Sequence, residues 1–378
     1  MNAKPYPFIE AFKRRGLGIL QDDVDPQQRA VLVAACERID YDLLNQVFTI
    51  SGGVPLVALS PMRAEAFLFA RMTRPGAGIG GAVGTAYQMY ISVDAREGIT
   101  TGISISDRLR TLNILGEAQP QPRKLVRPGH IFPVETREGG VLVRNALPEG
   151  ALDLARISGF SDAALLVDLL DQNGGYLTPS SQSRLAQVQA LPTTTLSELT
   201  AYRLQTEPLV VRVAEASLPT AATGLLRSYI YRSKLYGGEH LALVKGEISP
   251  VQPVLTRVQM EFTAADVFGG VFPPTRSQIH ACLRAIGDGP TGVFLYLRRS
   301  VKGHLKEQVH ALSLGKPPQR PLNLREYGIG AQILYDLGAR RIELLTNTPS
   351  DLASLKSFGL EVVSQRQLPR EKEYRAYG

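Results

Sequence analysis

The stretch LREYGIGAQILYDLGARRIELLTN, residues 324–347, decides the fold of the second half of this chain. Its apolar side chains recur at the helical period and share one face, at Leu324, Tyr327, Ala331 and Leu334. This spacing predicts a helix over residues 324–337, and IELLTN after it is typical of a buried strand. A helix that runs directly into a strand is the unit from which parallel sheets are built.

The segments around this stretch continue the alternation. GVFLYL (292–297) predicts a buried strand, SDLASLKSFG (350–359) a helix and LEVVS (360–364) a last strand. Strands and helices in alternation imply right-handed crossovers with both faces of the sheet covered. We therefore expect an α/β fold for the second half.

The first half mixes short strands with helices. SISDRLRTLNIL (104–115) has helical spacing, and EGALDLARISGF (149–160) predicts a helix that ends at Gly159. Strands are expected in LGILQDD (17–23), VPLVALS (54–60), YQMYISVDA (87–95), the two runs of HIFPVETREGGVLVR (130–144) that join at residues 138–140, and ALLVDLLDQNGG (164–175). Residues 191–209 lack clear periodicity and are the expected linker. The glycine-rich PGAGIGGAVG (75–84) lacks the strand and helix of a dinucleotide site, so we expect a loop there.

Composition limits the class of protein. A chain of 378 residues suggests two domains, and 44% hydrophobic with 20% charged residues is typical of a globular protein. A membrane span needs about 18 consecutive apolar residues, and neither such a run nor a signal-peptide core is present, so we expect a cytoplasmic protein without a membrane partner. The net charge of +7 favours anionic partners. Phosphorylated small molecules fit better than nucleic acid, because no zinc-finger spacing or RNA-binding aromatic pattern occurs.

Several motifs carry a resemblance to known families. The first half contains, in order, ITTGISISDRLRT (99–111), RPGHIFP (127–133), EGGVLVR (138–144) and EGALDLARISGF (149–160), and it resembles 3,4-dihydroxy-2-butanone-4-phosphate synthase. The second half contains ADVFGG (265–270), GVFLYLR (292–298), the 324–347 stretch and GLEVV (359–363), and it resembles GTP cyclohydrolase II. Their fusion is similar to the bifunctional enzyme that supplies both riboflavin precursors. The resemblance implies a mixed α+β synthase-like domain over residues 1–200, an α/β cyclohydrolase-like domain over residues 201–378, and a homodimer.

The resemblance places altered residues at the metal positions of both families. The synthase family holds magnesium through a Glu and a His, which match Gln27 and Leu147, and its substrate-binding Arg matches Pro26. The cyclohydrolase family holds zinc through three cysteines, which match Phe262, Pro273 and Thr275. Magnesium prefers oxygen ligands and zinc prefers thiolates or imidazoles. We therefore expect no cofactor, and no metal site from Cys36 and Cys282 or from His280, His304 and His310.

The residues that match anion-holding positions are better retained. In the synthase-like half these are Thr101, Gly102, Asp107, Arg108, Thr111, Arg144 and Glu149. His130 and Asp168 match positions at which a proton could be moved. A helix that opens near Ser106 also offers free N–H groups to a phosphate. The alternative is that Asp107 and Arg108 only cap and brace the helix.

The cyclohydrolase-like half keeps part of a nucleotide site. Arg257, Gln278, Arg298 and Thr346 match nucleotide-binding positions, and Arg325 matches a catalytic arginine. The guanine-reading Glu becomes Ser300, a phosphate-site Lys becomes Asp351, and the partner of Arg325 is Asn323, which suits a helix cap with Glu326. We therefore expect a divergent homologue that binds phosphosugar or nucleotide anions in a regulatory or accessory role. The alternatives are altered chemistry on such a ligand, or residual parent activity in riboflavin biosynthesis.

Overall fold

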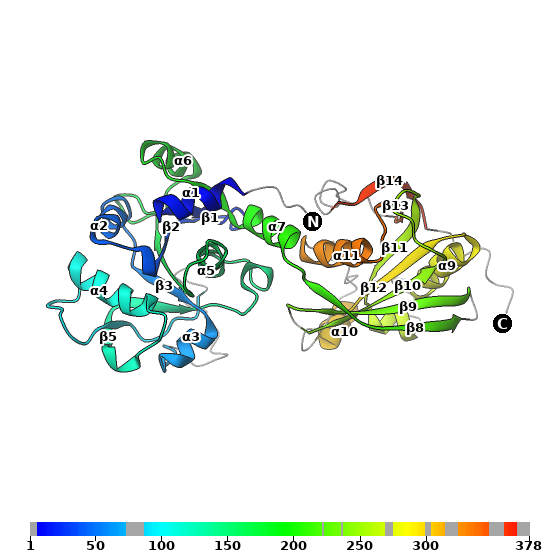
Figure 1. Ribbon diagram of the computed structural model, residues 1–378, viewed down its shortest axis with the longest axis horizontal. Helices are drawn as coiled ribbons and strands as arrows, with labels where there is room; N and C mark the ends of the chain where they lie inside the picture. Colours follow the sequence, from blue (N-terminus) through cyan, green and yellow to red (C-terminus); the bar gives the residue numbers. More distant parts are fainter. Residues whose placement is uncertain are drawn as a thin grey trace. The chain divides into compact units, whose positions relative to one another are not determined.

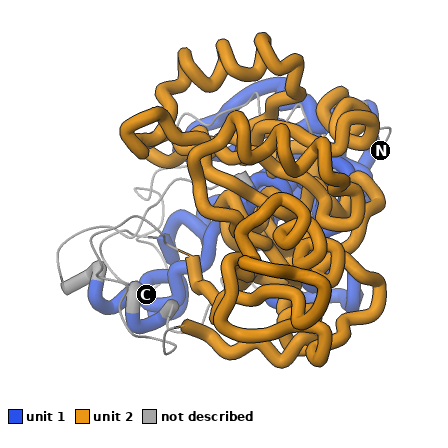
Figure 2. Tube along the Cα trace, turned by 90° about the vertical axis from the view of Figure 1, so that its left-hand side faces the viewer, with its two compact units in different colours: residues 1, 204–378 blue, residues 2–203 orange. Residues whose placement is uncertain are grey.

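The computed structural model describes residues 6–72, 87–220, 223–235, 237–268, 275–298, 304–313, 324–347 and 359–368. The chain divides into two compact units, residues 2–203 and residues 204–378 together with residue 1 (Figure 2). Each unit is built on its own seven-stranded sheet (Figure 1). We call them the N-terminal and C-terminal domains.

The N-terminal sheet has the order β4-β5-β3-β6-β2-β1-β7. Its strands are β1 (Gly18–Gln21), β2 (Ala30–Ala35), β3 (Leu56–Leu59), β4 (Val93–Ala95), β5 (Leu125–Glu135), β6 (Ala163–Asp168) and β7 (Thr193–Thr195). The pairs β3–β5 and β1–β7 are parallel and the others are antiparallel. The sheet is therefore mixed, as expected for this half.

Helices cover both faces of this sheet. They are α1 (Pro7–Arg15), α2 (Tyr41–Ile50), α3 (Pro61–Ala66), α4 (Ile105–Gly116), α5 (Leu147–Ile157), α6 (Pro179–Val188) and α7 (Leu196–Thr206), with short 3-10 turns η1 (Cys36–Arg38), η2 (Pro122–Lys124) and η3 (Gly140–Leu142). Successive side chains of β2 point to opposite faces. Leu32 packs in one core with Leu112 of α4, and Val33 packs in the other with Leu152 of α5. Both faces of the sheet are thus buried.

Three sequence predictions in this domain were wrong. Residues 141–144 form the turn η3 and its continuation instead of a second extended run, because Gly139 and Gly140 both adopt positive φ and turn the chain. The expected linker at 191–209 instead contains β7 and all of α7. Only the end of YQMYISVDA forms a strand, β4, while Met89 and Tyr90 make isolated bridges. Local sequence did not reveal these tertiary pairings.

The C-terminal sheet has the order β14-β13-β11-β12-β10-β9-β8. Its strands are β8 (Val210–Thr220), β9 (Gly224–Ser233), β10 (Glu239–Lys245), β11 (Val254–Met260), β12 (Gly292–Leu297), β13 (Arg341–Leu345) and β14 (Glu361–Arg366), and its helices are α8 (Thr263–Phe268), α9 (Thr275–Asp288), α10 (His304–Ser313) and α11 (Leu324–Asp336). The strands β12, β11, β13 and β14 pair in parallel, whereas β8, β9, β10 and β12 pair antiparallel. The predicted parallel arrangement therefore holds for one side of a mixed sheet.

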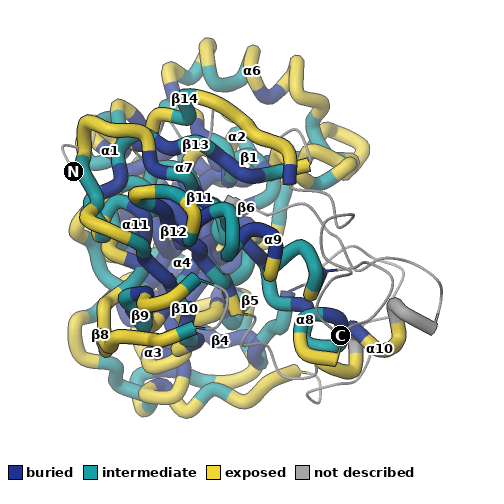
Figure 3. Tube along the Cα trace, turned by 90° about the vertical axis from the view of Figure 1, so that its right-hand side faces the viewer, coloured by how far each residue is buried: buried dark blue, intermediate teal, exposed yellow. Residues whose placement is uncertain are grey.

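The buried core between α9 and the sheet contains Cys282, as its neighbours predicted. The edge strand β8 is exposed along almost all of its length (Figure 3). Among the described residues, no helix is long and apolar enough to cross a membrane.

Candidate functional site

The start of α4 is shaped by a carboxylate that binds the loop before it. Ser104 caps the helix by accepting a hydrogen bond from the backbone N–H of Asp107. The Asp107 carboxylate in turn accepts hydrogen bonds from the backbone N–H groups of Thr100 (3.1 Å) and Gly102 (3.0 Å). Burial raises the pKa of Asp107, but these hydrogen bonds outweigh it and leave the pKa below its ordinary value. Asp107 therefore fixes the loop in its anionic form.

Thr111 has a similar bracing role one turn later. Its hydroxyl accepts a hydrogen bond from the N–H of Ala95 at 2.9 Å and donates one to the carbonyl of Asp107. Asp107 and Thr111 thus use their polar atoms to hold the protein itself. Thr101 also bonds locally, because its hydroxyl accepts from the N–H of Ile103.

The loop carries Gly102 against a histidine–aspartate pair. The ring Nδ1 of His130 lies 2.7 Å from one carboxylate oxygen of Asp94. The backbone N–H of His130 donates to the other oxygen of this carboxylate at 2.9 Å. Asp94 is buried while the His130 side chain is half-exposed. A Cβ added to Gly102 would clash with the Asp94 carboxylate and lie 2.6 Å from His130 Nδ1, and Gly102 has a φ of +79°. Only glycine fits this position without a shift of the pair.

Arg108 completes this cluster. Its guanidinium lies 4.3 Å from the ring centroid of Phe48, and its buried Nε has no hydrogen-bond partner. Burial lowers the pKa of Arg108, and the nearby charge of Asp94 opposes that shift. We refer to Asp94, Gly102, Arg108 and His130 as the α4 cluster. The sequence motifs did not reveal Asp94 and Phe48, although an Asp within a short buried strand is a usable signal for Asp94.

Arg144 and Glu149 form a separate ion pair. Glu149 is fully buried and accepts hydrogen bonds from the Arg144 guanidinium at 2.7 Å and from the N–H of Arg137 at 2.9 Å. Arg144 also donates to the carbonyl of Glu135. Burial raises the pKa of Glu149, and Arg144 counteracts the shift. Their contacts tie η3 to α5, so both residues have a structural use.

Asp168 lies in a third group of residues. Burial raises its pKa, and the charge of Arg29 opposes the shift. Arg29 is ion-paired with Asp25 at 2.7 Å and lies beside the rings of Tyr87 and Tyr176. Asp168 and His130 lie on β6 and β5, which are separated by β3, so their strands are roughly 10 Å apart. The expected acid and base pair is therefore not a hydrogen-bonded pair here.

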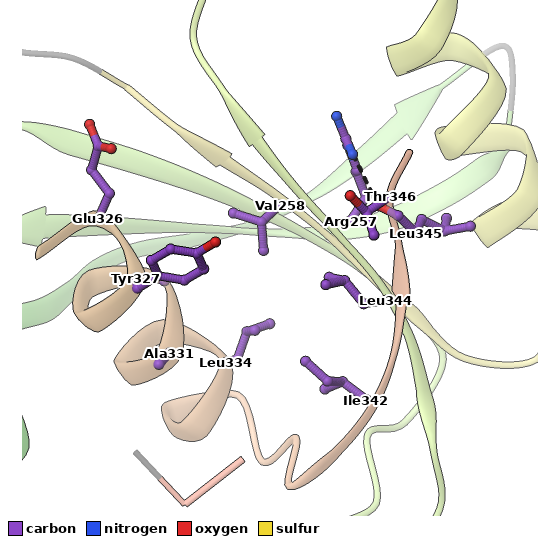
Figure 4. Close-up of a pocket in the computed structure, with 11 residues that line it drawn as sticks. Arg257, Val258, Glu326, Tyr327, Ala331, Leu334, Ile342, Leu344, Leu345 and Thr346 are labelled. Carbon is purple, nitrogen blue, oxygen red and sulfur yellow. Dashed lines mark hydrogen bonds between the residues drawn. The ribbon is translucent and has the colours of Figure 1, made fainter. Parts of the chain in front are cut away.

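In the C-terminal domain, Arg257 and Thr346 line a cavity of about 70 Å³ between α11 and the sheet (Figure 4). The Arg257 guanidinium donates to the carbonyl of Leu345 at 3.0 Å and to the side-chain oxygen of Gln259 at 2.7 Å. Burial lowers the pKa of Arg257, and the nearby Cys282 opposes the shift. The other lining residues are mainly apolar, including Val258, Leu334, Ile342 and Leu344.

The remaining predicted nucleotide residues do not line this cavity. Gln278 is half-buried on α9, Arg298 is exposed and lies 3.9 Å from Glu261, and Arg325 is half-buried near the start of α11. Glu326 and Tyr327 line the cavity instead (Figure 4). The predictions for Asn323, Ser300, Asp351, Pro273 and the 75–84 loop lie outside the described residues.

The residues at the expected metal positions differ in what they offer. Leu147 and Phe262 are buried and carry no donor atom. Gln27 is exposed, and Thr275 is buried with a hydroxyl that has no hydrogen-bond partner. No group of three or more His, Cys, Asp or Glu side chains in the described ranges could hold a metal ion. These side chains do not reproduce the ligand sets that the resemblance implies.

Comparisons with known proteins cover both domains. Residues 7–202 match the family model described as 3,4-dihydroxy-2-butanone 4-phosphate synthase, and residues 211–367 match the one described as GTP cyclohydrolase II. The chain is 34% identical over 373 residues to "Riboflavin biosynthesis protein RibBA" of Aquifex aeolicus, which covers 94% of this chain and 90% of that protein. It is 38% identical over 302 residues to the protein of the same name from Salinispora arenicola, which covers 76% and 70%.

One solved structure agrees with this assignment over almost the whole chain. A crystal structure of "RibBX, a two domain 3,4-dihydroxy-2-butanone 4-phosphate synthase from A. baumannii" aligns with a TM-score of 0.75 at 27% identity and covers 96% of this chain and 99% of that one. A synthase described as "in complex with two Magnesium ions" covers 53% of this chain and 96% of its own, at 26% identity and a TM-score of 0.49.

The expectation that the chain needs no cofactor is corrected by these findings. Residues 7–202 match the synthase family model, and the chain is 34% identical to a RibBA protein with 94% of this chain covered, so the family assignment overturns an expectation that rested on single positions. Substitutions at single ligand positions, such as Gln27 and Leu147, do not outweigh a match over the whole domain. The error came from treating ligand identity at matched positions as decisive for the family's metal.

Proposed function

The chain belongs to the family of riboflavin-biosynthesis proteins that join a 3,4-dihydroxy-2-butanone 4-phosphate synthase domain to a GTP cyclohydrolase II domain, and we propose that its N-terminal domain binds a phosphorylated sugar at the α4 cluster. The observation that carries the proposal is Arg108, whose guanidinium rests on Phe48 and whose buried Nε has no partner. Arginine matches the geometry of a phosphate with several N–H donors.

The neighbours of Arg108 support the same ligand. Asp107 holds the loop at Gly102 in place by accepting a hydrogen bond from its backbone N–H, so the start of α4, which an anion would approach, has a fixed shape. The half-exposed ring of His130 lies at the same place and can contact the sugar part of the ligand. A phosphosugar matches this combination of a cation, a helix start and a hydrogen-bonding imidazole.

The role that we propose is accessory or regulatory within riboflavin biosynthesis. The A. baumannii protein has two domains and is described by the synthase activity alone. In this chain the C-terminal Arg257 is occupied by internal hydrogen bonds, which fits a domain with weakened nucleotide binding. The test is complementation: the protein is expressed in cells that lack one of the two parent activities, and these cells are grown without riboflavin. If they grow, the accessory role is wrong.

The direct test is calorimetric titration of the full chain with ribulose 5-phosphate and with ribulose. We expect the phosphate ester to bind at least about tenfold more tightly, which corresponds to about 1.4 kcal/mol. Arg108→Ala removes this preference, while Arg184→Ala, an exposed arginine of α6, retains it. Equal affinity of wild type and Arg108→Ala for ribulose 5-phosphate contradicts the proposal.

A second candidate function is proton transfer on the bound sugar. Asp94 fixes the Nδ1 side of His130, which leaves Nε2 to accept a proton from the carbon next to the sugar's carbonyl. The electron pair of the broken C–H bond moves onto the carbonyl oxygen and forms an enediolate, and return of a proton restores the ketose. In D₂O, NMR is expected to show deuterium at that carbon with wild type and not with His130→Asn. No exchange with wild type rejects this candidate.

We also propose a homodimer in the cytoplasm. The edge strand β8 exposes Val211, Val213 and Leu218, and a long apolar edge is a surface that proteins normally cover. Light scattering on the eluting protein measures the mass, and a monomer at micromolar concentration contradicts the dimer. Cell fractionation tests the location.

A further inference from the structure

A second polar hollow lies on α4, apart from the α4 cluster. It has a volume of about 910 Å³ and lies between α4, the loop after β4 and the turn η2. Its lining residues are Arg96, Glu97, Gly98, Ser106, Leu109, Arg110, Asn113, Ile114, Glu117, Gln121, Arg123 and Lys124. Arg108 does not line it, although Arg110 two residues later does. The two arginines therefore serve different surfaces of the same helix.

The charge of this hollow is positive. Four basic side chains face two acidic ones, so the lining carries a net charge of +2. Glu117 is already neutralised by Lys124, with 2.7 Å between the ammonium nitrogen and a carboxylate oxygen. The charge left over is on the arginines. An anion that enters the hollow is attracted to them.

Two of these arginines are held in place by backbone carbonyls. Arg110 donates from Nε to the carbonyl of Glu97 at 2.5 Å, and Arg96 donates from Nε to the carbonyl of Arg123 at 2.7 Å. A guanidinium has five N–H donors, so donors remain on both side chains after these bonds. Preorganised arginines lose less conformational freedom when they bind a ligand.

Gly98 allows Arg110 to reach this position. A Cβ at Gly98 would lie 2.6 Å from Cζ and 2.7 Å from Nε of Arg110, and Gly98 has a φ of +71°. The guanidinium therefore lies directly against the glycine backbone. A side chain at position 98 would push it out of the hollow.

We propose that this hollow binds a phosphate monoester of nucleotide size, with its phosphate at Arg96 and Arg110. The volume is within the range of about 300–1,000 Å³ that small-molecule sites occupy, and is larger than inorganic phosphate requires. Leu109 and Ile114 offer an apolar wall for a flat ring, and Asn113 and Gln121 offer amide groups to its edge. A concave site with few cations favours such a molecule over an extended polyanion, which needs many phosphate contacts. The proposal does not depend on sugar binding at the α4 cluster.

The test is calorimetric titration of the full chain with adenosine 5′-monophosphate, guanosine 5′-monophosphate, inorganic phosphate and a single-stranded oligonucleotide. We expect at least one mononucleotide to bind at least about tenfold more tightly than inorganic phosphate. Arg110→Ala is expected to weaken this binding at least about tenfold, and Asn113→Glu, which adds a negative charge at an exposed position without removing an internal contact, is expected to weaken it as well.

Three controls make the outcome decisive. Arg184→Ala should bind mononucleotides like wild type, and circular dichroism should show all variants folded. Arg108→Ala should keep mononucleotide binding, so failure of the sugar site is distinguishable from failure of this one. The proposal is overturned if neither mononucleotide binds, if inorganic phosphate binds equally well, if the oligonucleotide binds more tightly, or if Asn113→Glu leaves affinity unchanged.

Discussion

Arg108 in the N-terminal domain and Arg257 in the C-terminal domain are both half-buried arginines at positions that match substrate contacts, yet they are used differently. Arg257 gives its two terminal nitrogens to Leu345 and Gln259, and its buried Nε has no partner, as in Arg108. Arg108 stacks on Phe48, and its guanidinium makes no hydrogen bond to any described residue that would compete with a ligand. The difference between the two arginines therefore lies in their terminal nitrogens, which the protein satisfies in Arg257 and leaves available in Arg108.

The largest expected effect tests whether the two domains are independent in stability. Asp153 is buried and pairs with Arg203 at 2.6 Å, so Asp153→Ala leaves Arg203 without its carboxylate. Removal of one partner of a buried pair costs about 3–5 kcal/mol. Hydrogen exchange measured by mass spectrometry should show faster amide exchange in the variant than in wild type for peptides of β1–β7. Peptides of β9–β13 should exchange at the wild-type rate.

The exposed pair of Arg341 and Glu361 is the matched control. Glu361→Ala should change stability by about 0–1 kcal/mol, as exposed pairs do. If Asp153→Ala lowers amide protection equally in both domains, the two domains unfold together and are not independent in stability.

A second effect is a pH dependence of stability in the C-terminal domain. His240 is buried, and burial together with Arg298 lowers its pKa from 6.5 to about 4. Between these values the unfolded chain binds more protons than the folded one, so the stability of the C-terminal domain falls as the pH drops from 6.5 to 4. The loss is on the order of 3 kcal/mol. Urea unfolding of wild type and His240→Gln, followed by circular dichroism across this range, checks it, since the variant should lack this part of the pH dependence.

A third effect concerns the α4 cluster. Gly102→Ala places a Cβ against Asp94 and His130, so affinity for ribulose 5-phosphate should fall at least about tenfold, or 1.4 kcal/mol. Gly174 also has positive φ, but a Cβ added there would meet no atom within 4 Å, so Gly174→Ala carries the backbone strain alone. Titration calorimetry should show normal affinity for Gly174→Ala. Equal losses in both variants would mean that backbone strain, not the cluster, controls binding.

The smallest expected effect is a gain in the stability of the C-terminal domain. Gly330 lies inside α11 at the cavity of Figure 4, and an added Cβ would lie 3.7 Å from Leu295 and Leu297. Because these are ordinary contacts, Gly330→Ala should stabilise this domain by roughly 0.5–1 kcal/mol. Urea unfolding measures the gain. Gly129→Ala is the opposite control, since its Cβ would clash with the backbone of Val93 and should destabilise the N-terminal domain.

The sequence predicted the elements whose patterns are local. The helix at residues 324–337 is α11 with nearly the same bounds, and GVFLYL is β12. The turn at η3 was mistaken for a strand because its direction depends on Gly139 and Gly140 and on the Arg144–Glu149 pair. Segment 191–209 was mistaken for a linker because β7 is a strand only through its pairing with β1, which is distant in sequence. Local periodicity carries no information about such distant partners.

The site was predictable to a similar degree. Gly102, Arg108 and His130 were found from motifs, and the structure brings them together. Asp94 was not predicted because its role depends on a contact with His130, which is 36 residues away in the sequence. Arg257 could not be judged from sequence, since the carbonyl that satisfies it is 88 residues away. Residue type predicted where cations lie, but only three-dimensional contacts distinguish available cations from satisfied ones.

The bare outer edge of β8 has a consequence for the order of folding. β8 and β9 are adjacent in sequence and pair along their length, so this hairpin can form as soon as both strands leave the ribosome. The strand β12, which completes the middle of the sheet, is synthesised about sixty residues later. The strand β10 follows β9 directly and covers its other edge, but during that interval the outer edges of β8 and β10 are open to other chains. Arg212, Glu215 and Pro219 on β8 interrupt its apolar surface and hydrogen-bonding edge, and they can slow association of nascent chains through this edge while the rest of the sheet is incomplete.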